Sequence, residues 1–102
     1  MKTITEWLSQ WLLDQCDGDW EHENGVSITT LDNPGFQIEI DIKDARIAAL
    51  NIRTGTVENS ENDWYSYKIV DGRFIAAGDP LKLEFLLQTF KQIIEGDIKS
   101  SV

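Results

Sequence analysis

The sequence is poor in the residues that build covalent and metal-bound centres. Its 102 residues contain one cysteine, one histidine and two prolines. A single cysteine cannot form an internal disulfide, which is typical of a protein in a reducing cytoplasm. One histidine and one cysteine also fall short of the usual set of zinc ligands. We therefore expect a cytoplasmic protein without a bound metal or other cofactor.

Long hydrophobic runs and positive charge are scarce as well. No apolar stretch approaches the roughly 20 residues of a membrane-spanning helix, and the first residues lead into an amphipathic pattern rather than an apolar signal core. Nine Lys and Arg stand against 18 Asp and Glu, a formal net charge of −9. This balance disfavours nucleic acid and anionic lipid as partners and favours a basic protein. An acidic composition is, however, equally common among cytoplasmic proteins without such a partner.

The composition and length of the sequence are those of a single folded domain. Hydrophobic residues make up 41% of the chain, with four Trp, four Phe and two Tyr, which argues against disorder. A chain of this length usually forms one domain. Because there are no repeats, linkers or low-complexity stretches, we expect residues 1–102 to fold as a single domain.

The first helix is predicted at the N-terminus. Thr3 and Glu6 have capping-box spacing. Leu13 lies off the apolar stripe that follows, which suggests a helix covered on more than one side. Asp17-Gly18 is a helix stop. The stripe consists of Ile4, Trp7, Leu8, Trp11 and Leu12, and we expect its tryptophans to be buried.

A second helix is predicted near the C-terminus. Asp79 is placed to cap it, Pro80 to take the first helical position and Gly96 to end it. The tail over 97–102 is expected to be frayed. The apolar stripe of this helix consists of Leu83, Leu86, Leu87, Phe90, Ile93 and Ile94.

Alternating apolar and polar residues predict the sheet. The pattern is clearest over 36–43, where isoleucines alternate with polar residues, so one face should be buried and the other wet. Residues 44–50 are ambiguous, because they also fit a short helix, and we favour a strand over 49–53. Residues 54–63 are predicted to form a polar loop. The remaining strands are expected over 26–31, 64–70 and 73–77.

Two turns connect these strands. Asn33-Pro34-Gly35-Phe36 fits a type II turn, with proline second and a glycine of positive φ third. Asp71-Gly72 is a strong signal for a two-residue hairpin. The predicted fold is therefore α+β: an antiparallel sheet of four to five strands with an N-terminal and a C-terminal helix packed on it.

The polar stretch over 16–25 offers the most chemistry. Its first acids have the spacing of EF-hand ligands, but His22 and Ile28 stand where that loop needs glycine and glutamate. Acid–base catalysis by these carboxylates and His22 is conceivable, although no nucleophile, phosphate-binding glycine loop or second histidine accompanies them. From the residues alone, we interpret the stretch as a helix-to-strand connection in which Asp side chains accept turn amides and Trp20 covers the edge of the core.

The same stretch carries a family resemblance. The run QCDGDWEH over 15–22, followed by TLDNPG over 30–35 and the aromatic Phe36, resembles the immunity protein 53 family of bacterial polymorphic-toxin systems. The resemblance is strong over residues 6–42 and returns more weakly after Asn62 and in the closing helix. Leu12 stands where members of the family often carry an aromatic residue.

The resemblance implies a function that composition and spacing do not. Such proteins are non-enzymatic and lie in the cytoplasm of the bacterium that makes the toxin. They bind and neutralise a cognate toxin domain, which is often a basic nuclease. The net charge of −9 agrees with a basic partner.

Combining the resemblance with the clustered acids, we predict an acidic partner-binding surface and no catalytic residues. The surface would draw on the polar connection, the wet strand face, the acidic loop and one aromatic anchor. The candidate residues are Asp17, Asp19, Glu21, Glu23, Glu39, Asp41, Glu58, Glu61, Asp63 and Trp64.

Two alternatives remain from other classes of protein. One is a small metal- or carboxylate-dependent hydrolase that uses the segment from Asp17 to His22. The other is an aromatic-lined binding module, because Trp64, Tyr65 and Tyr67 lie on both faces of one predicted strand, so that at least one ring should reach the surface.

Overall fold

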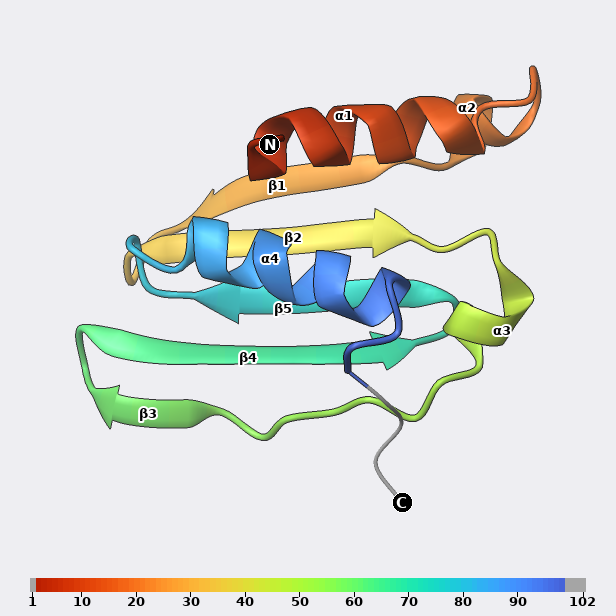
Figure 1. Cartoon of the computed structure of the whole chain (residues 1–102). Coiled ribbons are helices and arrows are strands. Elements are labelled where there is room, and N and C mark those ends of the chain that lie inside the picture. The colour runs from red at the N-terminus through yellow and green to blue at the C-terminus, as the bar shows by residue number, and fades with distance from the viewer. Residues whose placement is uncertain (1, 99–102) are drawn as a thin grey trace.

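The chain folds into two layers, a five-stranded sheet and a layer of helices (Figure 1). The computed structural model describes residues 2–98. In chain order the elements are α1 (Ile4–Gln15), α2 (Trp20–Glu23), β1 (Val26–Leu31), β2 (Gly35–Asp41), α3 (Ala45–Ala48), β3 (Val57–Ser60), β4 (Asp63–Val70), β5 (Arg73–Gly78) and α4 (Leu83–Ile94).

The sheet is antiparallel with the strand order β1-β2-β5-β4-β3. Both long helices, α1 and α4, lie on the same face, where α4 crosses β2 and β5 and α1 lies along β1 (Figure 1). This arrangement confirms the predicted α+β fold. None of the described helices is long and apolar enough to cross a membrane.

The core lies between the helices and one face of the sheet. Ile38, Ile40 and Phe74 project from the central strands and are fully buried against Phe90 of α4. The ring of Trp11 meets that of Phe90 edge to face, with centroids 5.0 Å apart. The predicted apolar stripes of both helices therefore face the core, although only part of each stripe, including Trp11, is buried, and Trp7 packs against the core partly buried.

At the start of α1 the predicted cap is confirmed, since the Glu6 N–H donates to Thr3 Oγ1 at 3.1 Å. The helix ends at Gln15, before the predicted stop. The expectation that α1 is covered on a second side is wrong at Leu13, whose side chain is 64% exposed.

The segment between β2 and β4 differs from its prediction. Residues 45–48 form α3, because Asp44 Oδ1 accepts the Arg46 N–H at 2.8 Å and caps the helix. The strand predicted over 49–53 is wrong. Within this range, the only β-pairing is an isolated bridge between Arg53 and Lys68 of β4. The loop predicted over 54–63 is wrong in part, because β3 forms by backbone pairing with β4 in spite of its polar side chains.

The turn before β2 is also not the predicted type. The Asn33–Pro34 peptide bond is cis, and Gly35 belongs to β2 without a positive φ. A Cβ atom on Gly35 would collide with the Gly78 carbonyl oxygen and lie 3.3 Å from Trp64 Cζ2. Close packing between neighbouring strands, rather than a left-handed conformation, therefore requires this glycine.

The start of α4 lies three residues beyond its prediction. Asp79 and Pro80 do not cap the helix, which begins at Leu83 after Lys82. Asp79 is instead bound to other backbone groups, as described below. The predicted end is confirmed, because Gly96 has a φ of 85° and follows the last helical turn.

The predicted β4–β5 hairpin is confirmed by the positive φ values of Asp71 (52°) and Gly72 (75°). Of the tail expected to fray, residues 99–102 lie outside the described residues. Asp97 still donates its N–H to the Gln92 carbonyl at 2.8 Å.

Candidate partner-binding surface

The sheet face opposite α1 and α4 is covered by no helix that the structure describes, and we call it the open face. Strand register fixes its membership, because side chains alternate between the two faces and directly paired residues share a face. The open face carries Ser27, Thr29, Leu31, Gly35, Gln37, Glu39, Asp41, Glu58, Trp64, Ser66, Lys68, Val70, Arg73, Ile75 and Ala77.

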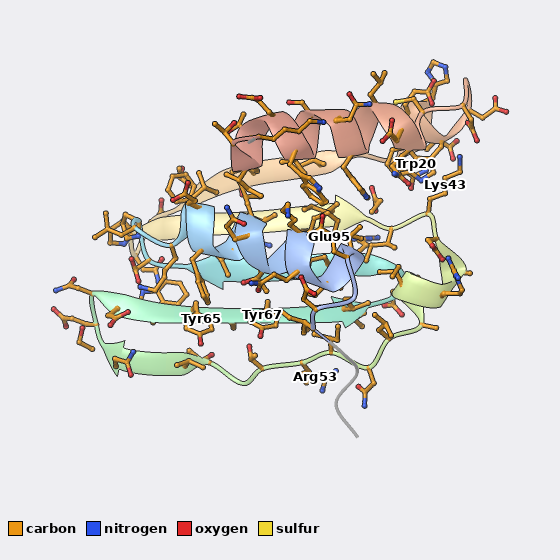
Figure 2. The ribbon with its side chains drawn as sticks, viewed as in Figure 1. Trp20, Lys43, Arg53, Tyr65, Tyr67 and Glu95 are labelled. Carbon is orange, nitrogen blue, oxygen red and sulfur yellow. The ribbon has the colours of Figure 1, made fainter. Side chains whose placement is uncertain are left out.

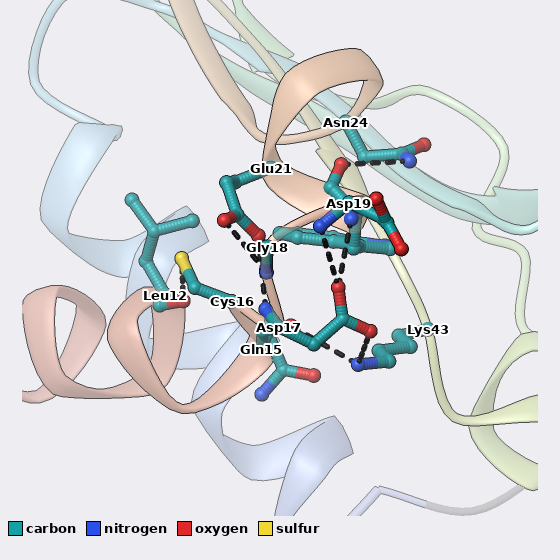
Figure 3. A network of polar contacts seen from close by, with 10 residues as sticks. Leu12, Gln15, Cys16, Asp17, Gly18, Asp19, Glu21, Asn24 and Lys43 are labelled. Carbon is teal, nitrogen blue, oxygen red and sulfur yellow. Dashed lines mark hydrogen bonds and ion pairs between the residues drawn. The ribbon is translucent and has the colours of Figure 1, made fainter.

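Two of the candidate acids hold the connection between α1 and α2 instead (Figure 3). Asp17 Oδ1 accepts the N–H groups of Asp19 and Trp20, both at 2.9 Å. Asp17 Oδ2 pairs with Lys43 Nζ at 2.8 Å. The hydrogen bond from Lys43, followed by the two backbone bonds, holds the pKa of Asp17 well below its usual range.

Glu21 closes the same turn from the other side (Figure 3). Its two carboxylate oxygens accept the N–H groups of Asp17 and Gly18, each at 2.9 Å, and backbone hydrogen bonds lower the pKa of Glu21. Trp20 packs edge to face on Trp11, with centroids 6.5 Å apart. These contacts agree with the interpretation as a helix-to-strand connection, although the helical turn α2 is not predicted from the sequence.

Asp63 also lies away from the open face. Its Oδ1 pairs with Lys82 Nζ at 2.7 Å on the helix side of the sheet. The hydrogen bonds from Lys82 and then Asn59 lower the pKa of Asp63. Asp63, like Asp17 and Glu21, is thus occupied by contacts within the chain.

At one end of the open face, four acids from α2, β2 and the β4–β5 turn gather in a shallow hollow, which we call the first acidic patch. Asp41 Oδ2 accepts the Gly25 N–H at 2.9 Å, and Asp41 Oδ1 lies 3.6 Å from Arg73 Nε. Within residues 2–98 the side chain of Glu39 makes no hydrogen bond or ion pair. The hollow is lined by His22, Glu23, Glu39, Asp41, Asp71 and Arg73 together with residues 24–27.

A second acidic patch lies at the opposite ends of the strands. Glu58 and Glu61 line a hollow with Trp64, Asn33 and Thr56. Both glutamates are exposed, and their side chains have no hydrogen bond or ion pair in the described part of the chain. Glu58 and Trp64 are directly paired across β3 and β4, so both face the same way.

A short basic strip, which the sequence did not predict, lies in the same cross-strand row as Glu39 of the first acidic patch, because Glu39 and Lys68 are both paired with Ile75. Arg53 and Lys68 are bridge partners and line a hollow with Gln37 and Ile75 of the open face. Figure 2 places Arg53 on the segment that runs along β4. The sequence could have placed Lys68 on the open face, because neighbouring residues of a strand point to opposite faces and the apolar Ile69 beside it is buried.

The aromatic residues of β4 divide between the faces, as expected. Trp64 is half-buried on the open face, whereas Tyr65 and Tyr67 lie side by side on the helix side (Figure 2), with nearly parallel rings 6.2 Å apart. The Tyr65 ring also meets Phe85 of α4 at 4.8 Å. Burial, and then the neighbouring Tyr65, raises the pKa of Tyr67.

Of the remaining candidates, Asp19 and Glu23 are exposed. Asp19 precedes α2 without a capping hydrogen bond from its side chain, and it lies outside both acidic patches. His22 is exposed on α2. Among residues 2–98, no three His, Cys, Asp or Glu side chains are grouped so that they would hold a metal ion.

The fold and this surface define an acidic α+β protein with one charged, uncovered sheet face. Residues 5–95 match the family described as Immunity protein 53, so the chain belongs to this family of immunity proteins. Neither the curated proteins nor the solved structures contain a match to the chain.

Proposed function

We propose that this protein confers immunity in the bacterial cytoplasm by binding a cognate toxin domain, without catalysis, through its open face. Membership of the immunity protein 53 family supports an immunity function. The observation that favours this face is that Glu39 and Glu58 stand on it without a partner in the described chain, whereas Asp17 and Asp63 are bound internally.

The charge pattern indicates what the toxin presents. Free carboxylates at both ends of the open face fit Lys or Arg side chains, and the strip of Arg53 and Lys68, across the sheet from Glu39, fits an acidic or hydrogen-bonding group. The net charge of −9 would raise the association rate with a basic toxin domain, such as a nuclease. Trp64 supplies an aromatic anchor beside the second patch.

The first experiment is co-expression with the toxin domain encoded beside this protein's gene, scoring survival and co-purification together. We expect survival with a stable complex. Survival without a complex would contradict direct binding and favour an enzyme that acts on the toxin or its product. Death of the cells would show that this toxin is not the partner.

The second experiment tests the surface with matched charge reversals. Glu39→Lys with Glu58→Lys changes the open face, and Asp14→Lys with Glu84→Lys makes the same change in net charge on the helices. We expect the first pair to abolish protection and the second to preserve it. Equal protection by both pairs would exclude the open face as the binding surface.

A further inference from the structure

The two edges of the sheet are built differently. Strand β3 forms one edge; it is four residues long, carries Glu58, and its register shifts between Glu58 and Ser60. Short length, charge and irregular register are the usual protections of an edge against another strand. Strand β1 forms the other edge, and it has none of the three: it has six uncharged residues, no proline and an unbroken register with β2.

The pairing pattern shows which backbone groups of β1 are available. The Asp41 N–H donates to the Gly25 carbonyl at 3.0 Å, so these two residues form a hydrogen-bonded pair. In an antiparallel ladder such pairs recur at every second residue, which directs the backbone of Ser27 and Thr29 toward β2. The N–H and C=O groups of Val26, Ile28 and Thr30 therefore point away from the sheet.

The side chains of β1 also suit a strand partner. Ile28 is 41% exposed, which is unusual for an isoleucine on the core side of a sheet. Ser27 and Thr29 stand on the open face beside their β2 partners Glu39 and Gln37. A strand added at this edge would cover Ile28 and bring its own side chains next to the first acidic patch.

We propose that β1 is the docking edge for an extended strand of the cognate toxin domain, which adds a sixth strand to the sheet. Backbone hydrogen bonds would supply the attachment, as in other cases of strand addition. Glu23 precedes β1 and Asp32 follows it, so the complementary strand carries Lys or Arg at its ends. This proposal depends on the proposed function, because it names how the same toxin is held.

A second copy of this chain is the competing occupant, and the charges oppose it. The outward groups of β1 allow two copies to pair antiparallel with Ile28 opposite Ile28. That register places Glu23 of each copy beside Asp32 of the other. Each copy also brings a net charge of −9, so like charges would meet at both ends of the joined strands.

The test is hydrogen exchange of the free protein and of the complex purified after co-expression with the neighbouring toxin domain. We expect the amides of Ile28 and Thr30 to exchange rapidly in the free protein and to be protected at least tenfold in the complex. Concentration-dependent protection in the free protein would instead show pairing between copies. A complex that forms without protecting these amides would overturn the edge proposal and leave the proposed function standing. Absence of any complex would overturn both.

Matched variants provide the second readout. Ile28→Pro and Thr30→Pro each remove an outward N–H without removing a hydrogen bond to β2. The control variants Ile28→Val and Thr30→Val keep that N–H. With each variant's fold checked by circular dichroism, we expect the proline variants to bind the toxin domain about tenfold or more weakly than their valine partners, consistent with losing about one hydrogen bond. Equal binding by folded proline and valine variants would contradict the proposal. The exchange experiment decides the matter if a proline variant does not fold.

Discussion

Replacing Asp79 with alanine should be among the most damaging single changes in this protein. Asp79 is only 1% exposed, and its carboxylate joins the start of β4 to the turn before α4. Its oxygens accept the N–H groups of Trp64 and Leu81, both at 2.9 Å, and Lys82 Nζ at 2.7 Å. The alanine variant leaves all three donors without this acceptor, although Lys82 keeps Asp63.

The expected cost follows from those contacts. An unsatisfied buried donor costs about 1–3 kcal/mol, and removing one partner of a buried ion pair costs about 3–5 kcal/mol. We expect Asp79→Ala to lower the free energy of unfolding by about 3–5 kcal/mol. Since about 1 kcal/mol shifts the Tm of a domain near this size by at least ~4 °C, the Tm should fall by about 12 °C or more.

Thermal unfolding followed by circular dichroism measures this shift, with Asp63→Asn as the control. Asp63 is the other, half-exposed partner of Lys82, so its loss should matter far less. A Tm for Asp79→Ala within about 3 °C of the wild type would refute the reasoning.

The same residue gives a pH dependence. Burial opposes the ionisation of Asp79, but the hydrogen bonds from Lys82, Trp64 and Leu81 outweigh it and lower the pKa of Asp79. Its stabilising contribution is therefore present above the unfolded-state pKa of about 4 and is lost as the pH falls through the lower folded-state pKa. Between about pH 6 and pH 3, the wild type should lose more stability than Asp79→Ala. Parallel pH profiles would contradict this assignment.

Two further substitutions test the packing. Gly35→Ala should lower the free energy of unfolding by about 1–3 kcal/mol, because the added Cβ meets the backbone of β5. Gly55→Ala, which has open space around its Cβ, is the control. Equal denaturant midpoints for the two variants would refute the close-contact argument. Phe90→Ala should cost about 3–5 kcal/mol, because the ring is fully buried. Phe85→Ala, at a ring that is 43% exposed, should cost clearly less. A larger loss of unfolding free energy for Phe85→Ala than for Phe90→Ala in chemical denaturation would contradict the placement of Phe90 at the centre of the core.

The sequence predicted those parts of the fold that local patterns control. The alternation over 36–43 and the apolar stripe of α4 each reflect one buried face, and both are confirmed. Strand β3 was missed because its residues are polar, and only pairing with β4 makes them a strand. The start of α4 was misplaced because Asp79 has the chemistry of a cap but is bound to Trp64, 15 residues earlier.

For the candidate surface too, only features controlled by local sequence patterns were predictable. Alternation correctly placed Glu39 and Asp41 on the wet face of the sheet. It did not show that Asp17 and Asp63 are bound by Lys43 and Lys82, since these partners lie 26 and 19 residues away along the chain. The availability of an acid for a partner thus depended on tertiary contacts that acidic composition does not reveal.

The affinity of the purified protein for its toxin domain tests the central claim most directly. The Kd should be compared among the wild type, the Glu39→Lys/Glu58→Lys variant and the Asp14→Lys/Glu84→Lys variant at one salt concentration. Binding through the open face predicts a Kd raised at least about 100-fold for the first variant, equivalent to about 2.7 kcal/mol, and nearly unchanged for the second. Equal Kd values for the two variants would contradict the claim.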